Sequence, residues 1–228
     1  GACVCLSQPR RIKRGWPMSL DLKNVSVRWA NSSTLFGPLC ICVERGEIAT
    51  VMGPSGVGKS TPLDAIAGHL SSTFQLEGHI TLNGIDLRSL SPEARRIGLM
   101  FQDGGLFPHL SVGDNLAFGL TRTVVGRARR HAAVEVALKQ AGLDGFYLRD
   151  PASLSGGQRA RAALMRTLLA EPAALLLDEP FSKLDLALRG EMRSFAFEHI
   201  RRHNIPALLV THDPEDAKEA GDQKLVLA

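Results

Sequence analysis

The chain has 228 residues and is 44% hydrophobic, which is enough for one sizeable domain or for a core with an inserted lobe. Its formal net charge of +4 equals the four basic residues within residues 1–17, so the rest is neutral and charge gives no argument for a nucleic-acid partner. No apolar run reaches the ~18 residues that suggest a membrane helix. A role at a membrane would therefore be exerted at its surface, through partners.

Residues 1–18 precede the first regular pattern and are expected to be an extension that is disordered or foreign to the protein. They contain no apolar stretch of the kind found in secretory signals. Two C-x-C pairs, Cys3 with Cys5 and Cys40 with Cys42, lack the C-x-x-C spacing typical of zinc sites. We interpret them as reduced structural thiols, which fits a cytosolic compartment, with metal binding as the alternative.

The run Leu20–Trp29 alternates in two phases with a slip at Asn24, which predicts a strand with a bulge. Trp29 lies 24 positions before Gly53 and is a candidate platform for adenine. A base stacked on an aromatic ring gains about 1–3 kcal/mol. A half-buried structural tryptophan is the alternative. A further strand is predicted at 39–43.

The segment Gly53–Thr61 fits the phosphate-binding pattern G-x-x-x-x-G-K-[ST], between a predicted strand at 47–52 and a predicted helix at 63–67. Glycines let backbone N–H groups and a helix N-terminus approach phosphates. Lys59 would bring charge to the β- and γ-phosphates, Ser60 a hydroxyl to Mg²⁺ and Thr61 a backbone N–H. A glycine-rich turn that binds nothing is the alternative. The nucleotide-binding residues expected here are Gly53, Pro54, Ser55, Gly56, Gly58, Lys59, Ser60 and Thr61.

Downstream, 78–84 is predicted as strand and turn, Ser91 as a helix start, and 97–101 as a compact apolar strand. That strand ends at Gln102, which could reach Mg²⁺ or an attacking water, although a lone glutamine there is more often a solvated loop residue. Helical spacing then predicts helices at about 112–119 and 127–141, which indicate a helical insertion in an α/β core.

The segment Leu154-Ser155-Gly156-Gly157-Gln158 opens a predicted helix that ends at about Ala170, with Ser155 as its N-cap. The paired glycines would permit close approach by another group, and a helix N-terminus favours an anion. The segment is therefore a candidate second phosphate site. An ordinary capped helix is the alternative.

A buried apolar strand is predicted to end at Asp178 and Glu179, and another, over 206–211, at His212. The carboxyl ends of parallel strands are where α/β sheets bind ligands. Asp178 suits Mg²⁺, and Glu179 suits orienting or deprotonating the attacking water. Gln102 would converge with Asp178 and His212 beyond the same sheet edge. Solvated acids and a structural histidine are the alternatives.

The order of these motifs resembles the ATP-binding subunit of ABC transporters over residues 19–228, and the discriminating element is the signature at 154–158. The resemblance implies an α/β phosphate-loop NTPase core with an N-terminal antiparallel β subdomain (19–101 and 168–228). It also implies an inserted α-helical subdomain with the signature (102–167).

The resemblance also implies roles for single residues. Trp29 corresponds to the aromatic A-loop residue, Gln102 to the Q-loop, Asp178 and Glu179 to the Walker B pair, and His212 to the switch histidine. Glu179, His212 and Gln102 would be catalytic, and Ser60, Gln102 and Asp178 would bind the metal. Segments 101–103 and 106–112 resemble importer subunits of the thiamine, ferric-ion, polyamine and molybdate type. Two departures are Pro62, where a helix-forming residue is usual, and Lys183 in the D-loop 182–185, where alanine is more usual.

On this resemblance the chain is an ATPase that uses ATP and Mg²⁺ and forms a head-to-tail homodimer, with each ATP between the phosphate loop of one copy and the signature of the other. It would drive two membrane permease subunits from the cytoplasmic face of the inner membrane, with an external solute-binding protein as an indirect partner and no nucleic acid. One alternative is a soluble ABC ATPase that acts as a mechanical switch on nucleic acid or the ribosome. The other is a nucleotide-binding regulator with little turnover, against which Glu179 and His212 argue.

Overall fold

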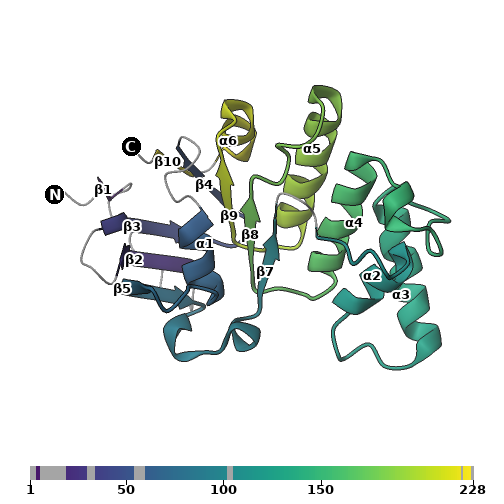
Figure 1. The fold of residues 1–228 in the computed structure, drawn as a ribbon, viewed down its shortest axis with the longest axis horizontal. Helices are drawn as coiled ribbons and strands as arrows, with labels where there is room; N and C mark the ends of the chain where they lie inside the picture. Colours follow the sequence, from purple (N-terminus) through teal and green to yellow (C-terminus); the bar gives the residue numbers. More distant parts are fainter. Residues whose placement is uncertain are drawn as a thin grey trace. The chain divides into compact units, whose positions relative to one another are not determined.

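The structure is a computed structural model that describes residues 4–5, 19–29, 34–53, 60–101, 105–221 and 223–226. Its strands are β1 (Val4–Cys5), β2 (Leu20–Trp29), β3 (Thr34–Val43), β4 (Ile48–Met52), β5 (Phe74–Leu82), β6 (Ile85–Asp86), β7 (Ile97–Met100), β8 (Ala174–Asp178), β9 (Ala207–Thr211) and β10 (Gln223–Val226) (Figure 1). Its α-helices are α1 (Ser60–Ala67), α2 (Val112–Gly119), α3 (Arg127–Gln140), α4 (Gly156–Leu168), α5 (Leu186–Arg202) and α6 (Pro214–Ala220). Three 3-10 turns are η1 (Leu87–Ser89), η2 (Pro92–Arg95) and η3 (Pro151–Ser153).

The chain divides into two compact units. The first unit comprises Gly1–Ile97, Ala173–Asp178 and Phe197–Ala228, and the second comprises Gly98–Pro172 and Glu179–Ala196. Both sheets lie largely in the first unit, and α2, α3 and α4 lie in the second. Residues 179–196 therefore group with the helical part of the chain, although the sequence analysis assigns them to the core.

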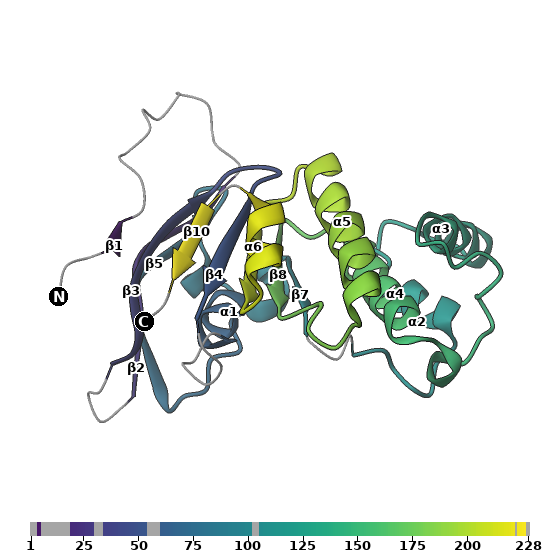
Figure 2. The same ribbon diagram turned by 90° about the horizontal axis from the view of Figure 1, so that it is seen from above.

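The first sheet has the strand order β1-β3-β2-β5-β6, and β2 pairs antiparallel with both β3 and β5; these three strands lie side by side in Figure 1 and are seen edge-on in Figure 2. The predicted bulge in β2 is confirmed, because Asn24 has a φ of 52° and the register of β2 shifts on either side of it. Within the predicted extension, β1 pairs parallel with β3. The prediction for the rest of residues 1–18 lies outside the described residues.

The second sheet has the order β10-β4-β9-β8-β7, and the pairings of β10 with β4, β4 with β9 and β9 with β8 are parallel. Strands β4 and β9 are buried at every residue, and β8 is buried at all but its last. Strands buried on both faces read as continuous apolar runs instead of alternating ones. This is why the sequence predicts these three strands correctly.

The second unit has its own apolar core. Helices α2, α3 and α4 match the predicted helical segments, and Val134, Ala137 and Leu138, which share one face of α3 at helical spacing, are buried. Gly119 brings α2 and α4 close together, because a Cβ at this position would overlap the backbone carbonyl of Arg166. The core residues include Val112, Leu116, Leu120, Val134, Ala137, Leu138, Ala141, Leu143, Leu154, Ala162 and Met165.

Candidate functional site

Three neighbouring strands of the first unit end at the same edge of the parallel sheet. Val51 on β4 pairs with Val210 on β9, and Val210 pairs with Asp178 on β8, so these residues form one row across the sheet. Gly53 and His212 each follow two residues beyond that row. The register therefore brings the start of the phosphate-loop motif, the Asp178 carboxylate and the strand-end histidine to one edge.

Part of the predicted site lies outside the described residues. This part comprises Pro54, Ser55, Gly56, Gly58, Lys59 and Gln102, so their roles stay predictions. Of the phosphate-loop motif, Gly53 follows β4 and Thr61 lies in α1, which begins at Ser60. Pro62 lies within the described part of α1.

Helix α1 is held at its far end by Arg95, which the sequence analysis missed. Arg95 is 8% exposed, and its Nη1 donates to the carbonyl oxygens of Ala65 at 2.9 Å and Ile66 at 2.7 Å. Burial lowers the pKa of Arg95, but arginine stays protonated in proteins. A cation at the C-terminus of a helix complements its dipole, whose positive end here points toward the phosphate-loop motif. A sequence pattern gives no sign of such a contact.

The end of β8 carries a concentration of negative charge. Burial raises the pKa of Asp64 on α1, His69 opposes this shift, and the nearby negative charge of Asp178 adds to it. The two carboxylates therefore lie within electrostatic reach of each other. A divalent cation would relieve this repulsion, and Mg²⁺ is commonly held by one or two carboxylates together with substrate phosphates. The residues present thus fit Mg²⁺ beside Asp178.

The chain turns tightly directly after Asp178. Glu179 has a φ of 43°, a left-handed conformation that few residues other than glycine adopt. Its carbonyl oxygen accepts hydrogen bonds from the backbone N–H of Ser182 at 3.2 Å and from Ser182 Oγ at 2.8 Å. Asp185 then accepts a hydrogen bond from the Leu188 N–H at the start of α5. Strained backbone of this kind clusters at functional sites.

In the second unit, the signature segment forms the N-terminus of α4, and Ser155 caps the helix as predicted. Ser155 Oγ accepts from the Gln158 N–H at 3.3 Å, and Gln158 Oε1 accepts from the Ser155 N–H at 3.0 Å, which completes a capping box. The two glycines differ in the space available for a side chain. A Cβ on Gly157 would lie 2.6 Å from Leu188 Cγ, whereas a Cβ on Gly156 would meet its nearest described atom, Leu184 Cδ2, at 3.5 Å. Packing within the chain therefore explains Gly157 and leaves Gly156 free for another group.

Trp29 ends β2 with its side chain 42% exposed. The ring centroid of Phe74, the first residue of β5, lies 4.6 Å from that of Trp29, with the planes tilted by 46°. The two rings form an aromatic surface where β2 ends and β5 begins. Trp29 is a candidate from the sequence, whereas Phe74 is not, because β5 was expected to begin only at residue 78.

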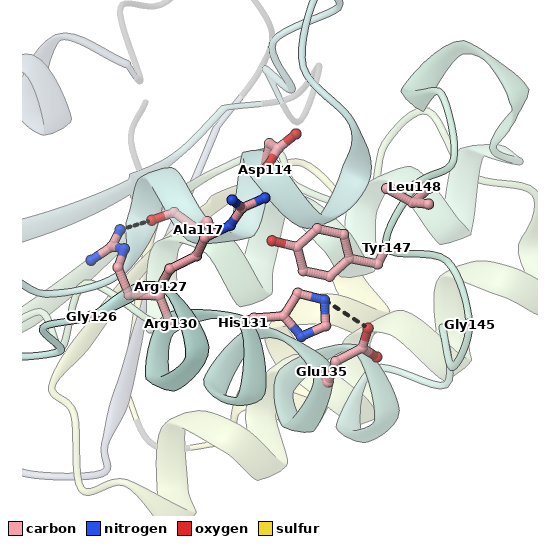
Figure 3. A pocket seen from close by; sticks show the side chains of 10 residues that line it. All are labelled: Asp114, Ala117, Gly126, Arg127, Arg130, His131, Glu135, Gly145, Tyr147 and Leu148. Atoms are coloured by element: carbon pink, nitrogen blue, oxygen red, sulfur yellow. Dashed lines mark hydrogen bonds and ion pairs between the residues drawn. The ribbon is translucent and has the colours of Figure 1, made fainter.

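The second unit also holds a pocket of about 850 Å³ that the sequence analysis did not predict. Figure 3 shows the rings of His131 and Tyr147 facing each other inside it, with centroids 4.4 Å apart. His131 Nε2 lies 3.8 Å from Glu135 Oε1. Burial raises the pKa of Tyr147. The pocket is lined by Asp114, Ala117, Gly126, Arg127, Arg130, His131, Glu135, Gly145, Tyr147 and Leu148.

A parallel sheet whose strands end in a phosphate-loop motif, an Asp-Glu pair and a histidine defines a nucleotide-hydrolysing protein of the phosphate-loop class. The sequence model of the family described as "ABC transporter" matches residues 37–182, and the chain belongs to this family. It is an ATP-binding ATPase of the ABC type. Trp29 and His212 lie outside the matched segment.

Two relatives and one solved structure agree with this assignment. The chain is 49% identical to the uncharacterized ABC transporter ATP-binding protein YnjD of Escherichia coli K12, over 86% of this chain and 90% of the relative. It is 40% identical to the thiamine import ATP-binding protein ThiQ of the same strain, over 82% and 80%. The dimeric post-hydrolysis structure of the ATP-binding cassette MJ0796 with ADP and Pi aligns over 91% of this chain and 94% of the MJ0796 chain, at 28% identity and a TM-score of 0.77.

In the described part of the chain, no helix is both long and apolar enough to cross a membrane.

Proposed function

We propose that this chain is the ATP-hydrolysing subunit of an importer and that it drives permease subunits in the membrane. The observation that carries the hydrolytic role is the row of Val51, Val210 and Asp178, since it gathers Gly53, Asp178 and His212 at one sheet edge. The name of the thiamine-import relative supports the import role, and the dimeric ATP-binding cassette supports a homodimer.

Each part of the site takes one function in this proposal. Trp29 stacks on adenine, and the ring of Phe74 supports that of Trp29. Ser60, Asp178 and Gln102 would hold Mg²⁺, which would neutralise charge on the phosphates of ATP. The remaining phosphate contacts of one copy come from Lys59 and the glycines of its phosphate loop. The other copy of the dimer contributes its signature residues Ser155, Gly156, Gly157 and Gln158.

Hydrolysis then depends on two side chains. Glu179 accepts a proton from the attacking water, whose oxygen bonds to the γ-phosphorus while the bond from that phosphorus to the bridging oxygen breaks. His212 contacts the γ-phosphate and holds it in line. The products are ADP and phosphate, and their release lets the dimer open.

The helical unit provides a surface for the permease. The side chains of Phe118, Val125 and Leu148 in this unit are exposed, and Leu148 also lines the pocket of Figure 3. An exposed apolar side chain gains free energy when a partner covers it. We assign these exposed side chains and the Gln102 loop to contacts with two permease subunits at the cytoplasmic side of the inner membrane, with an external solute-binding protein as an indirect partner. The alternative of a switch on nucleic acid or the ribosome is not favoured by the relatives.

The experiment is the Glu179→Gln variant, assayed for ATP turnover and, by light scattering, for ATP-dependent dimers. The amide keeps the shape of the side chain but cannot accept a proton, so we expect at least a roughly 100-fold loss of turnover and a stable dimer with ATP. Glu93→Gln, which changes an acid on η2, is the control and should match the wild type. Near-normal turnover of Glu179→Gln would contradict the proposal.

A separate observation tests the import role. Permease and binding-protein genes beside this one would support import, and translation or repair genes would oppose it.

A further inference from the structure

A buried hydroxyl group, that of Thr211, holds the loop between β9 and α6 that carries His212. Thr211 Oγ1 donates to Asp216 Oδ2 at 2.8 Å and accepts from the backbone N–H of Asp213 at 3.0 Å. The Thr211 and Asp216 residues are 2% and 3% exposed, whereas His212 between them is exposed. Thr211 directly precedes His212, and its hydroxyl is hydrogen-bonded to Asp213, which directly follows His212.

Helix α6 does not need this contact for its cap. Asp213 is the N-cap of α6, and its Oδ1 accepts from the Glu215 N–H at 2.8 Å. Asp216 therefore has a different task in the first turn. A buried carboxylate contributes little net stability compared with a well-packed apolar side chain, so its presence at a site of this kind points to a role other than stability.

The geometry suits the positioning of a side chain. A hydroxyl has one proton to donate and accepts through its lone pairs, and a hydrogen bond to a carboxylate is shorter and stronger than one between neutral groups. The carboxylate orients the hydroxyl, and the hydroxyl fixes the peptide N–H that follows the histidine. The peptide unit that follows His212 is therefore held, and Thr211 before it is the last residue of β9, while His212 itself is exposed at the sheet edge where Asp178 ends β8.

We propose that Thr211 and Asp216 are positioning residues that hold His212 in the orientation needed for ATP hydrolysis. This inference rests on the proposed role of His212 at the γ-phosphate. It predicts that loss of the hydroxyl impairs the chemical step without weakening the binding of nucleotide, because neither side chain contacts ATP.

The test is Thr211→Val, which removes the hydroxyl and keeps the shape of the side chain. A misplacement of about 1 Å in a catalytic group costs on the order of 100-fold in rate, so we expect kcat to fall by about 10- to 100-fold with KM for ATP unchanged. Thr211→Ser restores the hydroxyl and should recover most of kcat. Thr50→Val is the matched control, because Thr50 is fully buried in the adjacent strand β4 and its hydroxyl has no hydrogen-bond partner among the described residues.

The outcomes separate this inference from the proposed function. In single-turnover assays, Thr211→Val should add no further loss to a His212→Ala background. If His212→Ala abolishes hydrolysis while Thr211→Val has the wild-type kcat, the inference is wrong and the proposed role of His212 stands. If His212→Ala hydrolyses ATP normally, both are wrong. An equal fall of kcat in Thr50→Val would also overturn the inference, since any lost core hydroxyl would then have the same effect.

A second variant covers the case in which Thr211→Val does not fold. Asp216→Asn keeps an oxygen that can accept from Thr211 but removes the charge, so the hydroxyl is held less firmly. We expect a smaller fall in kcat than for Thr211→Val, again with unchanged KM. An Asp216→Asn enzyme with the kcat of the wild type would overturn the assignment of Asp216.

Discussion

At the scale of single residues, the pair of Trp29 and Phe74 gives the first prediction. Trp29→Ala should weaken ATP binding by about 1–3 kcal/mol, since it removes the ring on which adenine stacks. Phe74→Ala should cost less, about 0.5–1.5 kcal/mol, because it removes only the aromatic contact that supports Trp29. Nucleotide titration measures both, and kcat at saturating ATP should be unchanged.

Phe118 on α2 serves as the control for this pair, because it is a more exposed aromatic residue of the second unit. Phe118→Ala should bind ATP as the wild type does. If Trp29→Ala also retained full affinity, Trp29 would be the half-buried structural residue that the sequence leaves as the alternative.

Asp86 gives a prediction for pH. Its hydrogen bonds with the Arg88 side chain, the largest cause, and with the Arg88 N–H lower the pKa of Asp86 to about 2. A lowered pKa stabilises the folded state above the unfolded value near 4, and this stability is lost as the pH falls toward 2. The pair is more than a third exposed, so we expect less than about 1 kcal/mol.

Urea unfolding of the wild type and of Asp86→Asn measures this contribution. The difference between them should be present at pH 7 and should shrink as the pH falls from 4 toward 2. Arg88→Met should remove the same pH-dependent part, because it deletes the cation. A difference that stayed constant down to pH 2 would show that the ion pair is not its cause.

At the scale of elements, the two glycines at the N-terminus of α4 are expected to respond differently to substitution, because Gly157 is packed against Leu188 and Gly156 has space beside it. Gly157→Ala should lower stability by about 1–3 kcal/mol, because the new methyl group meets Leu188 on α5. Gly156→Ala should leave thermal stability near that of the wild type but reduce ATPase activity, because its methyl group would occupy the space that we assign to the partner's nucleotide. Thermal melts and turnover assays of both variants check this. Full activity of Gly156→Ala would remove the signature backbone from the site.

The elements that could be predicted from the sequence are those with a local signal. Buried parallel strands read as apolar runs, so the ends of β8 and β9 could be predicted at Asp178 and Thr211. Because parallel strands end at the same edge of a sheet, the residues that follow them could also be predicted to lie near one another. The early start of β5 was missed although its first residues, Phe74 to Glu77, alternate apolar and exposed polar side chains as a half-buried strand does. The contact of Arg95 with α1 and that of Gly157 with Leu188 join residues about 30 positions apart, and no local pattern encodes them.

At the scale of the whole molecule, the proposed function requires two copies of the chain. The phosphate-loop motif lies in the first unit and the signature in the second, and we propose that each ATP is bound by the first unit of one copy and the second unit of the other. Nucleotide can close such a dimer only through its difference in affinity for the closed and open states. Hydrolysis removes that difference, so turnover and opening of the dimer are linked.

Mixing two inactive variants tests this arrangement. Lys59→Ala removes the phosphate-loop charge and Ser155→Arg blocks the signature, so neither homodimer should hydrolyse ATP. A mixture forms heterodimers with one intact composite site and one doubly damaged site, and we expect it to regain measurable turnover. Each variant alone, at the same total concentration, is the control.

A mixture that stays inactive has two explanations, which crosslinking separates. In a chain whose four native cysteines are replaced by serine, Ser55→Cys and Ser155→Cys place one thiol in the phosphate-loop motif and one in the signature. If both sites must fire together, the mixture stays inactive, but a disulfide should still join two chains when ATP is present, because nucleotide brings these segments of opposite copies together. The product is a dimer band on a non-reducing gel, and the single-cysteine variants should give little of it. A crosslink that formed only within one chain would show that the phosphate loop and the signature meet inside a single copy, and the head-to-tail dimer would be wrong.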